Sequence, residues 1–268
     1  MNIIFAALTA TTLYLLCTLG LLLRLRQSPA SKNLGKATLL APGFLALIAH
    51  AFILYSTMIN SVGINFGFYS SLSLISASIT LLILISAIRH PIEIISILIM
   101  PVAALMIILD TLQSTSHIIA TGGSDGLLFH IMTSIIAYSI LGLAAAYAIV
   151  LSIQNSLLHS HQPGGFIRFL PPLKTMEALL FETITIGFIC LSIALASGLI
   201  FLDNIFAQHL VHKTVLSIIA WIVFGILLFG HQFIGWRGRT AIRWTLGGFF
   251  SLMLAYFGSK FVLEVLLT

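Results

Sequence analysis

The chain has 268 residues, of which 59% are hydrophobic and only 7% are charged. An ordinary soluble domain has about a quarter of its residues charged, so this composition excludes a soluble globular fold. Apolar runs of about 20 residues that lack the alternation of a barrel strand predict transmembrane helices. The net charge of +5 is explained by membrane topology, and no nucleic-acid partner is expected.

Eight apolar runs predict an all-α, polytopic membrane protein with about eight transmembrane helices in the lipid bilayer. In chain order the runs are Ile3–Leu23, Ala37–Met58, Gly67–Ile88, Ile92–Leu109, Leu127–Gln154, Thr175–Leu202, Thr214–Phe233 and Trp244–Leu266. The second helix could slide outward to about Ser61, because Ile59–Phe66 is only mildly polar. Without linkers, charge runs or repeats, we expect a single transmembrane domain over residues 1–268.

The basic residues predict the orientation of these helices. Ten of the twelve fall in alternate loops on one side: Arg24, Arg26, Lys32, Lys36, Arg89, Arg168, Lys174, Arg237, Arg239 and Arg243. By the positive-inside rule this side is cytoplasmic, so both termini are expected outside. Three acidic residues are assigned to the opposite loops: Asp110, Asp125 and Asp203. The first run has arginines after it and none before it, which predicts a retained anchor rather than a cleaved signal peptide.

Motifs of soluble enzymes are missing from the sequence. It has no phosphate-binding loop, no HExxH, no CxxC and no nucleophile elbow, so no enzymatic activity is predicted. Cys17 and Cys190 lie inside apolar runs, away from any metal-site spacing, and are interpreted as small lipid-facing or helix-facing residues.

Two histidines lie inside apolar runs, His50 in LALIAHAFILY and His231 in ILLFGHQF. An ionisable side chain at membrane depth suggests a site. Two neutral imidazoles facing each other across a bundle would be a natural axial pair for haem iron; alternatively, each is hydrogen-bonded separately to a neighbouring helix. His50 lies about 13 residues, or roughly 20 Å, from the inner end of its helix, and His231 lies close to its own inner end. The pair therefore requires the second helix to slide or tilt.

Other polar residues leave alternatives open. His130, in LLFHIMTSIIAY, is an outward-facing ligand, a pore-mouth residue or an ordinary interfacial histidine. Glu182 in the sixth run suggests proton or cation coupling, or a protonated or paired interior carboxyl. The arginines of the GWRGR turn, residues 235–239, are explained by topology, but could also pair with a propionate or a lipid phosphate.

Several segments resemble a known family, the cytochrome c assembly proteins that handle haem in bacterial and plastid membranes (the CcsA, ResC and CcmC relatives). The stretch LLFHIMTSIIAYSILG resembles that family's helix with an outward haem-ligand histidine. The stretch LLFGHQFIGWRGRTAIRWTLGG resembles its transmembrane histidine followed by a WRG(K/R) turn. The second helix, with IAHAFILY and then GINFGFYSSLSLIS, resembles the YpjD-like inner-membrane branch.

The resemblance covers about residues 37–268, with its most specific motif at Gly230–Gly248. It implies a multi-pass protein of the bacterial inner membrane that binds haem b. It also implies that His50 and His231 are the axial ligands of the haem iron and that His130 is the first outward ligand.

Two departures fall on the outward side. The family carries a tryptophan-rich loop of the form WGxxWxWD before the seventh helix, where this chain has DNIFAQHLVHK, and it has a second outward histidine after the last helix, where this chain ends in FVLEVLLT. We therefore expect haem handling or a redox-linked accessory role rather than haem synthetase or export activity. The alternatives are a haem-free accessory subunit that partners another membrane protein, and a small-molecule or ion permease that uses Glu182.

Overall fold

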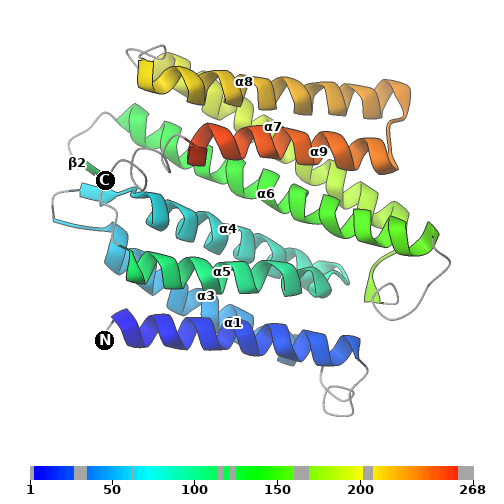
Figure 1. The fold of residues 1–268 in the computed structure, drawn as a ribbon, viewed down its shortest axis with the longest axis horizontal. Helices are drawn as coiled ribbons and strands as arrows, with labels where there is room; N and C mark the ends of the chain where they lie inside the picture. The colour runs from blue at the N-terminus through cyan, green and yellow to red at the C-terminus, as the bar shows by residue number, and fades with distance from the viewer. Residues whose placement is uncertain are drawn as a thin grey trace. The chain divides into compact units, whose positions relative to one another are not determined.

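The computed structural model describes residues 3–26, 35–61, 63–113, 117–120, 125–159, 169–201 and 208–258. The long elements in this part of the chain are α-helices (Figure 1), and seven of them are long and apolar enough to cross a bilayer. The all-α, polytopic membrane fold expected from the composition is therefore confirmed.

The chain forms two compact units, residues 1–121 with 157–171 and residues 122–156 with 172–268. The expectation of a single domain stays a prediction. The first unit contains α1 (Ile3–Leu25), α3 (Lys36–Met58), α4 (Phe68–Arg89), a short 3-10 turn (Glu93–Ile95) and α5 (Ser96–Leu112). The second contains most of α6 (Asp125–His159), with α7 (Leu173–Phe201), α8 (Gln208–Phe229) and α9 (Gly238–Met253). Two π-helical turns extend α8 and α9, at Gly230–Ile234 and Leu254–Gly258.

The helix bounds agree closely with the apolar runs in the first unit, but α6 extends to His159 instead of Gln154 and α8 begins at Gln208 instead of Thr214. α9 begins at Gly238 instead of Trp244, because its first turns carry Arg239 and Arg243 and so lack the continuous hydropathy that marks a span. The second helix does not extend outward to Ser61, because α3 ends at Met58. Residues 259–268, to which the last run was expected to extend, lie outside the described residues.

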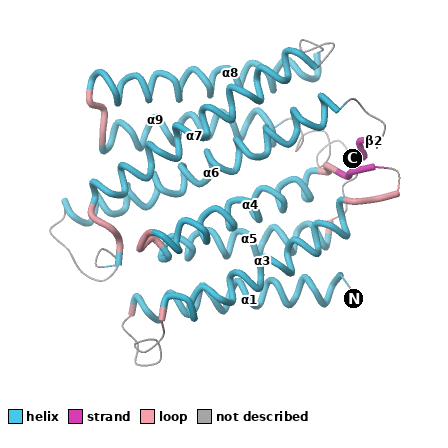
Figure 2. The backbone as a smooth tube through the Cα atoms, turned by 180° about the vertical axis from the view of Figure 1, so that it is seen from behind, coloured by secondary structure: helices cyan, strands magenta, loops and turns pink. Residues whose placement is uncertain are grey.

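A small antiparallel sheet, which the sequence did not predict, joins two connections of the first unit (Figure 2). Strand β1 (Gly63–Asn65) pairs with β2 (Ile118–Ala120), with Ile64 opposite Ile119. The Asn65 side-chain oxygen accepts hydrogen bonds from the backbone N–H groups of Gly67, at 3.0 Å, and His117, at 2.8 Å. Three-residue strands are too short to show a period of two.

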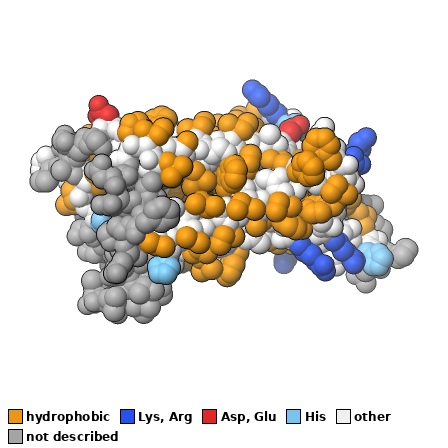
Figure 3. Space-filling view, turned by 90° about the horizontal axis from the view of Figure 1, so that it is seen from above, with side chains coloured by type: hydrophobic (Ala, Val, Ile, Leu, Met, Phe, Trp, Pro, Cys, Tyr) orange, Lys and Arg blue, Asp and Glu red, His pale blue; other side chains and the backbone are white. Residues whose placement is uncertain are grey.

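In the first unit, charged side chains gather at one end of the helices. Glu93 lies 3.7 Å from Arg24 and 3.5 Å from Lys36, whose ammonium also donates to the His90 carbonyl at 2.8 Å. On the face of the molecule that Figure 3 draws, hydrophobic side chains cover the middle, and the lysines and arginines that are visible lie toward one end. This distribution suits helices with apolar middles in hydrocarbon, while the outward position of the termini stays a prediction.

Candidate functional site

His50 lies in the interior of the first unit and has partners on both ring nitrogens. It is 0% exposed. Its Nδ1 lies 3.3 Å from the Tyr14 hydroxyl on α1, and its Nε2 lies 2.9 Å from the Ser73 hydroxyl on α4. Because a neutral imidazole has one donor and one acceptor nitrogen, one hydroxyl donates to the ring and the other accepts from it. His50 therefore ties three helices together.

His231 lies in the π-helical turn that follows α8 in the second unit. Its Nδ1 donates to the carbonyl of Trp236 at 2.9 Å. Its ring stacks on Phe181 of α7, with centroids 3.5 Å apart and planes inclined by 13°. A carbonyl can only accept, so the proton is on Nδ1 and the lone pair of the neutral ring is on Nε2. This is the arrangement in which a histidine is usually presented to a metal.

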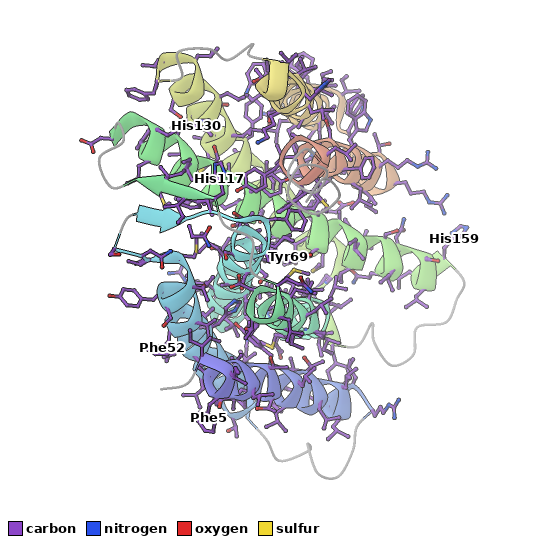
Figure 4. All side chains as sticks on the ribbon, turned by 60° about the vertical axis from the view of Figure 1, so that its left-hand side comes forward. Phe5, Phe52, Tyr69, His117, His130 and His159 are labelled. Carbon is purple, nitrogen blue, oxygen red and sulfur yellow. The ribbon has the colours of Figure 1, made fainter. Side chains whose placement is uncertain are left out.

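His130 lies five residues beyond the start of α6 in the second unit, and Figure 4 labels it together with His159 at the other end of that helix. Its Nδ1 donates to the Ala194 carbonyl on α7 at 2.9 Å and lies 3.2 Å from the Ser197 hydroxyl. The lone pair of the neutral ring is therefore on Nε2 here too. Gly198 leaves room for the ring, because a Cβ at that position would lie 2.9 Å from His130 Cε1.

A cavity of about 420 Å³ adjoins His130 between α7 and α8. Trp221 forms part of its wall; its indole N–H donates to the Ser192 hydroxyl at 2.8 Å, and its ring stacks on Phe188. Lys213 and Ser217 also line it, and the remaining lining is mainly apolar. A volume of this size falls in the range of small-molecule sites, about 300–1,000 Å³.

His130 and His231 both belong to the second unit. They lie at two separate places in that unit. His130 is near the N-terminal end of α6, whereas His231 follows the C-terminal end of α8. His50 belongs to the first unit, so its pairing with His231 on one iron stays a prediction. α3 covers the range first expected for the second run, so His50 stays roughly 20 Å along α3 from the helix end that was expected to face inward.

Two of these histidines fit haem iron as they stand. Haem iron needs only one or two axial ligands from the protein, and no group of three His, Cys, Asp or Glu side chains that could hold a bare metal ion occurs among the described residues. His231 and His130 each have Nδ1 bonded to a carbonyl. His50 would first have to give up its hydrogen bond to Ser73 or to Tyr14.

Two acidic residues lie differently from what the sequence suggested. Asp110, expected in a loop, is buried in α5, where it accepts hydrogen bonds from Ser70 at 2.7 Å and Thr57 at 3.4 Å. Hydropathy could not reveal this, because Asp110 is close to the end of its helix. Glu182 lies on the exposed face of α7 and does not line the cavity beside His130. Its use in ion coupling stays a prediction.

Comparison with known proteins places the chain among relatives. The family model described as cytochrome c assembly protein matches residues 38–267. The inner membrane protein YpjD of Escherichia coli K12 is 32% identical over 224 residues, which cover 83% of this chain and 85% of that protein.

More distant relatives carry the name cytochrome c biogenesis protein CcsA. That of Chlamydomonas reinhardtii is 24% identical over 57% of this chain and 43% of its own length, and that of Prochlorococcus marinus MIT 9515 is 22% identical over 67% and 63%. No solved structure matches the chain. Seven helices are long and apolar enough to cross a bilayer, and the relative that is matched over 85% of its length is named an inner membrane protein. The chain is therefore a multi-pass protein of the bacterial inner membrane. Because the family model covers most of its length, it belongs to the cytochrome c assembly protein family.

Proposed function

We propose that this protein binds haem b in the membrane and acts in haem handling, or in a redox-linked accessory role, within the cytochrome c assembly family. The observation that carries the proposal is His231, whose Nδ1 donates to the Trp236 carbonyl so that Nε2 keeps its lone pair. Cytochromes c are haem proteins, so a family that assembles them has haem as a natural ligand.

The environment of His231 supports haem better than another ligand. Its ring is held flat against Phe181, its Nε2 hydrogen-bonds to no residue in the described ranges, and the π-helical turn is followed by Arg237 and Arg239. Apolar and aromatic surroundings suit a macrocycle, and an Arg guanidinium is a good partner for a propionate carboxylate.

The residues that would hold haem are His231 as an axial ligand, His50 as its expected partner and His130 as a separate outward ligand. When bound, haem would supply one-electron chemistry or serve as the cargo that is handled. The protein's own part is to orient each imidazole by its hydrogen bonds and to surround it with apolar side chains.

Titration with ferric haem b tests the proposal. The purified, haem-depleted protein should bind haem with a Soret shift. His231→Ala should weaken binding at least tenfold, because losing only the hydrogen-bond partner of a metal ligand already costs about 10- to 100-fold in affinity. His50→Ala should remove the bis-histidine spectrum if His50 is the second ligand. His130→Ala should affect only haem bound at the outward site.

His212→Ala is the matched control, since His212 is an exposed histidine of the same unit. It should leave the titration unchanged. Equal affinity in the unaltered protein, His231→Ala and His130→Ala would contradict the proposal.

A further inference from the structure

The segment that carries His231 has an irregular backbone. α8 widens after Phe229 into a π-helical turn, Gly230–Ile234, and the chain then takes the left-handed conformation at Gly235, with φ 77°. The N–H groups of Gly235 and Trp236 both donate to the Gly230 carbonyl, the second at 3.0 Å. π-helical turns are rare and frequently lie at functional sites. The left-handed backbone conformation at the end of the turn favours glycine.

This turn brings the Trp236 carbonyl back to His231. The two residues are only five apart, and Nδ1 lies 2.9 Å from the carbonyl oxygen. A straight helix would direct that carbonyl along its axis toward a later N–H group. The turn therefore sets which ring nitrogen of His231 carries the proton.

Two contacts hold the π-helical turn in place, one between residues of the turn region itself and one with a residue of α7. The Trp236 ring lies directly over Gly230, where a Cβ would come within 2.4 Å of Trp236 Cε3. On α7, the Glu177 carboxylate accepts the N–H of Gly238 at 2.9 Å. Gly238 begins α9, and the N–H groups of a first helical turn need acceptors from outside the helix. Arg237 at the cap supplies no side-chain hydrogen bond, so Glu177 takes that place.

We propose that Gly230, Trp236 and Glu177 are positioning residues that hold His231 as the Nδ1–H tautomer, with Nε2 as the ligating atom. This inference rests on the proposed function, because a ligating Nε2 has a role only if His231 binds haem iron. The tautomer, however, is a property of the protein itself and can be measured without haem.

Nitrogen NMR of the full-length protein in detergent, labelled with ¹⁵N-histidine and free of haem, tests the tautomer. The His231 signal is identified by its loss in His231→Gln. The expected result is the Nδ1–H form in the unaltered protein and a mixture of tautomers in Gly230→Ala, because the new methyl group displaces Trp236. Gly247→Ala is the control, since a Cβ at Gly247 on α9 would meet no described atom within 4 Å; it should keep the Nδ1–H form.

A second pair of variants keeps the inference testable if Gly230→Ala does not fold. Glu177→Ala removes the acceptor for the Gly238 N–H, whereas Glu177→Gln retains an oxygen at the same place. Glu177→Ala should mix the tautomers and weaken ferric haem b binding at least tenfold. Glu177→Gln should keep mostly the Nδ1–H tautomer and most of the haem affinity.

The outcomes separate this inference from the proposed function. An unchanged Nδ1–H signal in Gly230→Ala and in Glu177→Ala would overturn the positioning role, whatever haem does. A tautomer that responds as expected, in a protein that binds no haem in any form, would support the positioning role and overturn the proposed function.

Discussion

The histidines differ in how much of their surroundings the sequence could reveal. A histidine inside an apolar run is visible at once, so His50 and His231 were found as candidates. The partners of His50 were not, because Tyr14 and Ser73 are ordinary residues whose importance depends on which helix they meet. Trp236 lies in the conspicuous GWRGR turn, but its backbone carbonyl is what contacts His231, and a motif does not show that. His130 showed no signal beyond the family resemblance; its carbonyl partner at Ala194 is 64 residues away.

The hydrogen bond between Ser73 and His50 should contribute measurably to stability. Ser73→Ala leaves the His50 Nε2 unpaired in a fully buried place, and we expect a loss of about 1 kcal/mol in the free energy of unfolding. Titration of the detergent-solubilised protein with SDS, followed by circular dichroism, measures this.

Ser78→Ala is the control on the same helix, because the Ser78 hydroxyl donates only to the Leu74 carbonyl of its own helix at 2.9 Å. Its effect should stay within about 0.5 kcal/mol. Equal losses in the two variants would argue against a structural role of the pair.

At the scale of the elements, hydropathy located seven spans well and failed where helices are irregular. The π-helical turn at Gly230–Ile234 and the strands β1 and β2 lack a repeated apolar pattern, and so no periodicity could indicate them. The contacts between helices were also beyond reach. Gly187 of α7 shows why: nothing in its sequence context reveals that it lies against Leu141 of α6.

Gly187→Ala should loosen the packing of α6 on α7. A Cβ at Gly187 would lie 2.6 Å from Leu141 Cδ2 and 2.8 Å from its Cγ, and Leu141 is fully buried. Overpacking of this kind costs about 1–3 kcal/mol, which the same SDS titration would measure.

Gly225→Ala on α8 is the matched substitution. A Cβ there would make ordinary contact with Phe188 at 3.5 Å, so the higher helix propensity of alanine should stabilise the protein by up to about 1 kcal/mol. Similar destabilisation by both substitutions would show that the close approach of Gly187 to Leu141 is not what matters.

For the whole molecule, composition was enough to establish the class, because so few charged residues leave only the bilayer as a solvent. The helices of each unit could be predicted from the apolar runs, whereas the division into two units could not. The orientation in the membrane rests on the distribution of Arg and Lys and applies to each unit independently, so it can be tested in each.

Cysteine labelling in intact cells tests the orientation. In a background with Cys17→Ala and Cys190→Ala, Gln113→Cys after α5 should react with a membrane-impermeant maleimide from outside, because it follows a helix end without Lys or Arg. Arg239→Cys near the start of α9, on the arginine-rich side, should react only after the membrane is opened. The reverse pattern would refute the outward placement of the termini.

The absorption spectrum of the purified protein tests the central claim most directly. Protein prepared from haem-replete cells should show the Soret and alpha bands of a b-type haem with histidine ligation. His231→Ala should lose the part of these bands that comes from haem bound at His231, while His212→Ala keeps the spectrum unchanged. A colourless, correctly folded protein from such cells would contradict haem binding and favour a haem-free accessory role beside another membrane protein.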